Sequence, residues 1–180
     1  PTVAAVNGPA AGAGMNLALA CDLRVASDQA TFGETFNRIG LHPDWGGTYF
    51  LPRLAGTSRA LELCWLADSI GAEEALRIGL VNHVWPEAEF EPGWRELASR
   101  LAAAPATSVR LAKRTLRASH ARTLEECLDA EADAQRACWQ SADSAEGLRA
   151  FVEKRAPVFA AASASADTDG AGAAQAFRFE

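Results

Sequence analysis

A run of small residues near the N-terminus most limits what this chain can fold into. Gly8-Pro9-Ala10-Ala11-Gly12-Ala13-Gly14 lies between the short apolar segment 3–6 and an apolar stretch at 15–21. This order indicates a buried strand, a tight turn and a buried helix. Small side chains let another group approach the backbone, and the first N–H groups of a helix have no partner within it. The turn therefore predicts either close helix–strand packing or a cradle for an oxyanion or phosphate.

The order of the other predicted elements indicates a fold class. Strands are predicted at 3–6, 22–26, 30–32 and 80–85, and helices at 15–21, 48–54, 58–66, 72–78, 96–103, 109–119, 124–139 and 143–154. Strands and glycine turns come first and helices dominate afterwards, which favours an α/β core followed by a helical C-terminal region. We expect the core over residues 1–85 and the helical region over 86–159. The Ala-, Ser- and Gly-rich segment 160–180 is expected to be a disordered tail.

Composition excludes several functions and limits the partners. The net charge of -6 disfavours nucleic-acid binding. The four cysteines show no CxxC spacing, so we expect no metal site and no disulfide framework, but buried reduced thiols in a cytoplasmic protein. No apolar stretch is long enough to cross a membrane. Because Pro1 already lies at the start of a predicted core strand, we expect that an N-terminal segment is missing.

Longer motifs extend this picture over most of the chain. They are 1–14 with Leu17-Ala18 and Cys21-Asp22-Leu23, Phe32-Gly33, Gly40-Leu41, Pro43-Asp44-Trp45-Gly46-Gly47-Thr48, 51–56, 72–75 with 79–81, and 151–155 with Pro157 and Phe159. In this register, residues 1–159 resemble the crotonase (enoyl-CoA hydratase/isomerase) superfamily. The resemblance implies a crotonase-like α/β fold, a ββα spiral truncated at its N-terminus. It also implies that residues 86–159 are an oligomerisation region that builds homo-trimers or hexamers.

The resemblance also implies chemistry on a thioester enolate. The substrate is then an acyl-CoA, and no cofactor is expected beyond this coenzyme A thioester. Two backbone N–H groups hold the thioester oxygen, and preorganised donors of this kind contribute ~3–4 kcal/mol each. Ala13 corresponds to one donor, flanked by Gly12 and Gly14 in the substrate-binding turn. The second donor is expected upstream of Pro1.

The residues at the family's carboxylate positions favour isomerisation over hydration. Hydratases of the family use two carboxylates, and here Asn16 and Phe36 occupy those positions; neither side chain can act as a general base. The stretch 36–44 is similar to ring-epoxyphenylacetyl-CoA isomerases of aerobic aromatic degradation, in which the aspartate of this loop is the catalytic acid–base. Asp44 is therefore the candidate here. We expect Trp45 to limit water access, and burial beside apolar groups to raise the pKa of Asp44.

Other interpretations stay open. From local sequence alone, Asp44 could cap the helix near Thr48 or form an Asx turn. Glu34 could be a second carboxylate of the pocket, but a solvated loop residue is the favoured interpretation. His42 could assist Asp44, and Lys154 lies where the family's closing helix contacts CoA. The alternative functions are an enoyl-CoA hydratase-like lyase and a catalytically inactive assembly or CoA-binding subunit.

Overall fold

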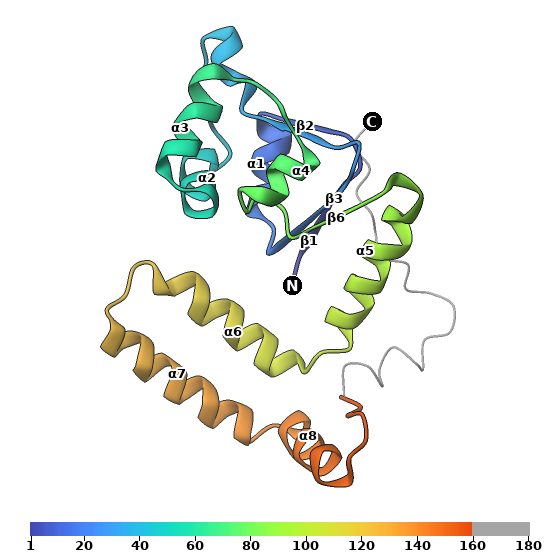
Figure 1. The fold of residues 1–180 in the computed structure, drawn as a ribbon. Helices are drawn as coiled ribbons and strands as arrows, with labels where there is room; N and C mark the ends of the chain where they lie inside the picture. Colours follow the sequence, from blue (N-terminus) through green and yellow to red (C-terminus); the bar gives the residue numbers. More distant parts are fainter. Residues whose placement is uncertain (160–180) are drawn as a thin grey trace. The chain divides into compact units, whose positions relative to one another are not determined.

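The computed structural model describes residues 1–159 and divides into two compact units (Figure 1). The first unit is Pro1–Ala98 and the second begins at Ser99. The division lies inside helix α5 (Glu87–Ala102), whereas the sequence analysis ends the α/β core at residue 85. The tail predicted at 160–180 lies outside the described residues.

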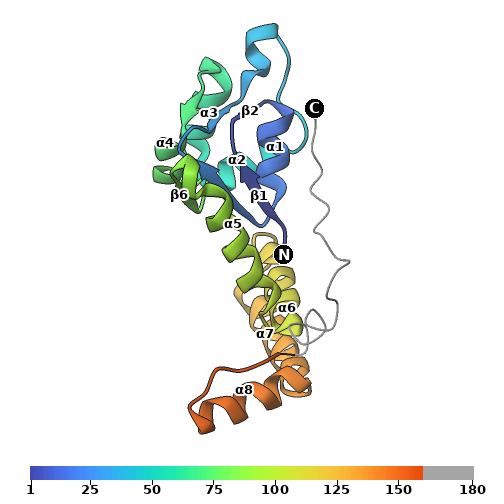
Figure 2. The ribbon, with the colours of Figure 1, turned by 90° about the vertical axis from the view of Figure 1, so that its right-hand side faces the viewer.

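Two small sheets form the strand layer of the first unit. The parallel strands β1 (Val3–Val6), β3 (Leu23–Ser27) and β6 (His83–Trp85) follow the order β1-β3-β6. Strand β4 (Thr31–Gly33) pairs in parallel with β2 (Pro9–Ala11) and antiparallel with β5 (Ile70–Gly71). The sequence analysis did not predict β2 or β5, because such short strands show no readable alternation. Figure 2 shows helix α1 (Ala13–Ala20) alongside the strands that precede it.

Short helices cover the sheets and enclose the core. They are the 3-10 helix η1 (Thr35–Ile39), α2 (Gly47–Ala55), α3 (Thr57–Leu66) and α4 (Ala72–Arg77). The core takes its large side chains from separate elements, with Met15, Phe32, Leu51 and Leu80 at most 1% exposed. Burying a side chain of this size contributes about 1.5–3 kcal/mol. The core therefore joins α1, β4 and α2, the elements around the glycine turn.

Helix α5 begins earlier than predicted. From the sequence it is expected to begin at Glu96; Pro92 and Gly93, just upstream, are typical helix breakers. The structure starts it at Glu87 and keeps Pro92 inside the helix. A Cβ on Gly93 would lie 2.7 Å from the Trp85 ring, so the missing side chain lets the helix pack directly on that ring. Tertiary packing outweighs the local breaker signal.

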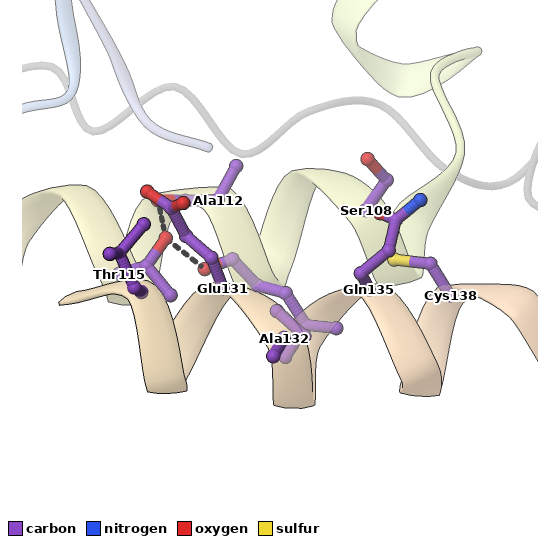
Figure 3. A pocket seen from close by; sticks show the side chains of 10 residues that line it. Ser108, Ala112, Thr115, Glu131, Ala132, Gln135 and Cys138 are labelled. Atoms are coloured by element: carbon purple, nitrogen blue, oxygen red, sulfur yellow. Dashed lines mark hydrogen bonds between the residues drawn. The ribbon is translucent and has the colours of Figure 1, made fainter. Parts of the chain in front are cut away.

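After the end of α5, the described part of the second unit forms the helices α6 (Ala106–Ser119), α7 (Leu124–Trp139) and α8 (Ala142–Glu153). Thr123-Leu124-Glu125-Glu126 has the sequence pattern of a capping box, and Thr123 and Glu126 form this box at the start of α7. A groove of about 540 Å³ runs between α6 and α7, with Thr115, Glu131 and Cys138 among its lining residues (Figure 3). Polar and apolar side chains both line this groove, whereas the core of the first unit is apolar and closed.

Two general expectations can be compared with the structure. Within residues 1–159, no helix combines the length and apolarity needed to cross a membrane. The four cysteines are free thiols, but each is partly exposed, so the expectation of buried thiols is wrong. Cys64, Cys127 and Cys138 lie on helices, where one side of the side chain faces solvent.

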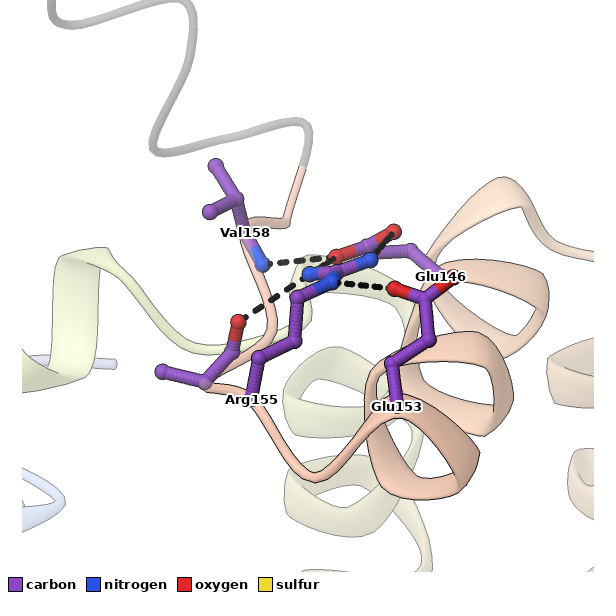
Figure 4. Close-up of polar contacts among 5 residues, drawn as sticks. Glu146, Glu153, Arg155 and Val158 are labelled. Carbon is purple, nitrogen blue, oxygen red and sulfur yellow. Dashed lines mark hydrogen bonds and ion pairs between the residues drawn. The ribbon is translucent and has the colours of Figure 1, made fainter.

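A polar cluster closes the end of α8. The Glu146 carboxylate accepts hydrogen bonds from Arg155 Nη1 at 2.6 Å, Arg155 Nη2 at 3.0 Å and the Val158 N–H at 3.0 Å (Figure 4). Arg155 Nε also donates to Glu153 at 2.6 Å. These hydrogen bonds lower the pKa of Glu146 to about 2, and the bonds from Arg155 contribute the largest part of this shift. Lys154 lies between Glu153 and Arg155 of this cluster in sequence, and its left-handed φ of 55° ends the helix.

We predict that Glu146→Gln loosens this helix end. The pKa of Glu146 lies below its usual 4.5, so its stabilising contribution is present above pH 4.5 and is lost as the pH falls toward 2. Hydrogen exchange of the Val158 amide should accelerate at neutral pH in the variant. In the wild type, the same amide should lose protection when acidified. Glu153→Gln, which removes a single Arg155 contact, is the control and should have the smaller effect; equal effects would contradict the prediction.

Candidate active site

The start of α1 has a backbone conformation that requires glycine. Gly12 has φ 50°, and its N–H donates to the Gly33 carbonyl at 2.8 Å. A Cβ at Gly12 would lie 3.2 Å from Phe36, so this ring packs against the turn. The N–H of Ala13, the first helical residue, has no hydrogen-bond acceptor among residues 1–159. Gly14 is exposed, with no atom within 4 Å of the place where a Cβ would be.

The Asn16 side chain links this helix start to the loop that carries Asp44. Asn16 is fully buried, and its Nδ2 donates to the Asp44 carbonyl oxygen at 3.0 Å and to Glu34 Oε2 at 3.4 Å. A Cβ on Gly47 would lie only 2.5 Å from Asn16 Nδ2, so this contact depends on a glycine. The side-chain NH2 group of Asn16 is thus already hydrogen-bonded within the protein. Its role toward substrate remains a prediction.

Glu34 is one of two carboxyl residues whose exposure was predicted wrongly from the sequence. It follows β4 directly and is fully buried, so the interpretation as a solvated loop residue is wrong. Burial raises its pKa to about 7; the Asn16 hydrogen bond opposes this shift and the charge of Asp44 adds to it. Glu34 lies beside buried Phe32 and Gly33, and that proximity in sequence was the one signal that could have indicated burial.

Asp44 lies beside this cluster, but its own side chain is exposed. Trp45 is 64% exposed and does not cover it, so the expectation of burial is wrong within residues 1–159. The capping alternative also lacks support, because the N-cap of α2 is Gly46 and no side chain caps it. His42 Nδ1 lies 2.6 Å from the Pro43 carbonyl oxygen, which makes the loop's own backbone its partner.

All but one of the candidate residues belong to the first unit, where the structure brings them together. The group around the helix start comprises Gly12, Ala13, Gly14, Asn16, Phe36, Glu34 and the Asp44 loop with Trp45. Lys154 belongs to the second unit, where its side chain is exposed at the end of α8. A CoA contact for Lys154 therefore stays a prediction. The first group contains a free backbone donor and two carboxyl groups, which is suited to proton transfer next to an oxyanion.

Comparison with solved structures defines the class to which this fold belongs. A crystal structure of an enoyl-CoA hydratase subunit from Geobacillus kaustophilus HTA426 matches with a TM-score of 0.85 and 40% sequence identity. The match covers 89% of this chain and 63% of that one. The fold is therefore crotonase-like α/β, as the sequence motifs predict.

Sequence comparison identifies the family. The family model described as enoyl-CoA hydratase/isomerase matches residues 1–162, and the chain belongs to this family. It is 47% identical over 159 residues to a probable enoyl-CoA hydratase of Rhodobacter capsulatus, covering 88% of this chain and 62% of the relative. It is 41% identical to the 1,2-epoxyphenylacetyl-CoA isomerase of Escherichia coli, covering 88% and 61%. The chain thus spans less than two thirds of these relatives, whose named reactions differ.

We predict that Gly47→Ala disrupts the link between Asn16 and the Asp44 loop. The new Cβ would overlap the buried amide, and overpacking of this kind costs about 1–3 kcal/mol. Chemical denaturation should report the loss in the free energy of unfolding. Gly14→Ala is the matched control, because its Cβ meets nothing and alanine favours the helix. Equal stability of the two variants would refute the close packing of Asn16 on Gly47.

Proposed function

We propose that this chain carries the acid–base residue of an acyl-CoA isomerase, which moves a double bond through an oxyanion-stabilised thioester enolate. The observation that carries the proposal is the Asn16 hydrogen bond to the Asp44 backbone. It ties the aspartate loop to the helix whose first N–H group has no acceptor within residues 1–159. The Escherichia coli relative is named a 1,2-epoxyphenylacetyl-CoA isomerase, which supports an isomerisation of an acyl-CoA.

The proposed reaction needs one base and one oxyanion donor. The Asp44 carboxylate removes a proton from the α or allylic carbon, and the electron pair of the C–H bond moves into the thioester as an enolate. The Ala13 N–H stabilises the negative charge on the thioester oxygen, by ~3–4 kcal/mol if it matches other donors of this type. Protonated Asp44 then returns the proton to a different carbon. Substrate and product are isomers, so no cofactor is needed.

The neighbouring residues favour proton transfer over water addition. Phe36 is half-buried and packs against Gly12, filling the position of the second hydratase carboxylate with an apolar ring. Asn16 occupies the first position with an amide that cannot take a proton from water. Gly12, Gly14 and Trp45 are proposed to contact the acyl-CoA around these groups, and Lys154 its coenzyme A portion.

One observation favours hydration as a second candidate. Glu34 adds a carboxyl group beside the site, and the Rhodobacter capsulatus relative is named a probable enoyl-CoA hydratase. A general base must be ionised and must reach the water. Glu34 is fully buried and burial raises its pKa to about 7, which favours the protonated form in acidic to neutral solution. These properties make isomerisation the preferred reaction.

We also propose that the whole protein assembles as a homo-trimer or hexamer in the cytoplasm. The three helices of the second unit expose large apolar side chains, as is usual for surfaces that another subunit covers. They are Leu116, Leu124, Leu128, Trp139, Leu148, Phe151 and Val152, each at least 49% exposed. A non-catalytic assembly subunit would use the same surface.

The proposal predicts that Asp44→Asn in the natural full-length protein abolishes double-bond migration in a 3-enoyl-CoA. Loss of a general acid–base group lowers the rate by about 10²–10⁴-fold. Asp68→Asn is the matched control, because Asp68 is exposed beyond α3 and outside the site. Absorbance of the conjugated enoyl thioester would follow the reaction.

Two other outcomes of this experiment would contradict the proposal. Hydration of a 2-enoyl-CoA that persists in Asp44→Asn would establish the hydratase instead. Absence of turnover, together with no thermal shift of the wild type by any acyl-CoA tested, would indicate the non-catalytic subunit.

A further inference from the structure

Two buried acceptor atoms beside the site have no hydrogen-bond donor. Among residues 1–159 these are Asn16 Oδ1 and Glu34 Oε1, on side chains that are both fully buried. They belong to the same contact, since Asn16 Nδ2 donates to the other oxygen of Glu34 at 3.4 Å. Buried polar atoms are nearly always paired, so two vacant acceptors in one contact require an explanation.

The orientation of the Asn16 amide is determined by its other contact. Nδ2 lies 3.0 Å from the Asp44 carbonyl oxygen, which is an acceptor and requires a donor. Exchanging the nitrogen and oxygen of the amide would place two acceptors against each other. Asn16 Oδ1 therefore remains an acceptor, and rotating the amide by 180° cannot give this oxygen the hydrogen-bond donor that it lacks.

A single proton on Glu34 would satisfy both vacant atoms. A protonated Oε1 becomes a donor, and Asn16 Oδ1 is the vacant acceptor of the residue already bonded to Oε2. The result is a reciprocal carboxylic acid–amide pair. Burial and the negative charge of Asp44 both favour the neutral acid, and they raise its pKa to about 7 against the Asn16 hydrogen bond. The other titratable group that interacts with Glu34 is the Cys64 thiol of α3.

We propose that Glu34 is a positioning residue that, in its protonated form, pairs with Asn16 and thereby holds the Asp44 peptide against the start of α1. The catalytic consequence of this inference rests on the proposed function, whereas the pairing itself does not. Asn16 then has one amide hydrogen on Asp44 and one on Glu34, and its oxygen accepts from Glu34. The loop carrying the base is fixed by an amide that has no unpaired atom.

The pairing gives the protein a defined pH dependence. Because the pKa of Glu34 rises from 4.5 to about 7 on folding, the native state binds a proton that the unfolded chain has already released between these values. Stability contributed by Glu34 therefore falls as the pH rises from 4.5 to about 7 and levels off above that. Ionisation removes the donor to Asn16 Oδ1, so turnover should fall over the upper part of the same range.

Two Glu34 variants of the natural full-length protein test the pairing. Glu34→Gln keeps one donor and one acceptor toward Asn16 but cannot titrate, whereas Glu34→Met removes both. Glu73→Gln, on the exposed first turn of α4, is the matched control for charge. Difference infrared spectroscopy at pH 5.5 and pH 8.5 measures the protonated carboxyl, thermal unfolding measures stability, and kcat against pH measures turnover.

The proposal predicts a carboxylic acid band at pH 5.5 that disappears in Glu34→Gln and persists in Glu73→Gln. Glu34→Gln should keep kcat within about twofold and lose the decline toward alkaline pH, while Glu34→Met should lower kcat at least about tenfold with little change in KM. If the wild type shows no band attributable to Glu34, or Glu34→Gln retains the alkaline decline, the proposal is overturned. If the band is present but no acyl-CoA is turned over, the pairing stands and the proposed function fails.

Discussion

The organisation of the site depends on one buried amide. Asn16 lies on the first turn of α1 and bonds the backbone of Asp44, a residue 28 positions further along the chain. The amide fits because Gly47 has no side chain, and Gly12 supplies the positive φ that begins the helix. Two glycines and one asparagine thus bring a backbone donor and the loop that carries Asp44 to the same end of the helix. The core beneath them makes this arrangement rigid, because Met15 and Leu51 anchor α1 and α2 in the same apolar cluster.

Local patterns predicted much of the fold, and tertiary contacts account for what they missed. The glycine turn predicted the strand–helix junction, and Thr123 with Glu126 predicted the start of α7, because both signals act within a few residues. The early start of α5 depends on Gly93 packing against Trp85, and β5 depends on pairing with β4. Such contacts join segments whose proximity no local pattern encodes. The crotonase-like class was accessible because its motifs recur in register over residues 1–159.

The site shows the same limit at the level of single residues. The sequence indicated which side chains could carry chemistry. Asn16 and Phe36, at the two carboxylate positions of hydratases, already disfavoured hydration because neither can act as a general base. It did not indicate exposure, so Asp44 was expected to be buried and Glu34 solvated, and the structure reverses both. Glu34 follows Gly33, where a Cβ would come within 2.7 Å of Ser69, and its carboxylate accepts a hydrogen bond from Asn16 of α1. Both contacts join segments that are far apart in the chain, so a single sequence does not reveal them.

The reversal changes the chemical interpretation of the two carboxyl groups. When neighbouring acids occupy different environments, their protonation states separate and so do their roles. The exposed Asp44 is suited to accepting a proton from a substrate, whereas the enclosed Glu34 is suited to donating a hydrogen bond inside the protein. In the proposed pairing, Glu34 is a buried neutral acid hydrogen-bonded to Asn16, and such a group cannot act as a base on a water molecule. A single accessible base next to an oxyanion donor is sufficient for returning the proton to another carbon of the same substrate. The buried environment of Glu34, more than its presence, therefore supports the isomerisation that we propose.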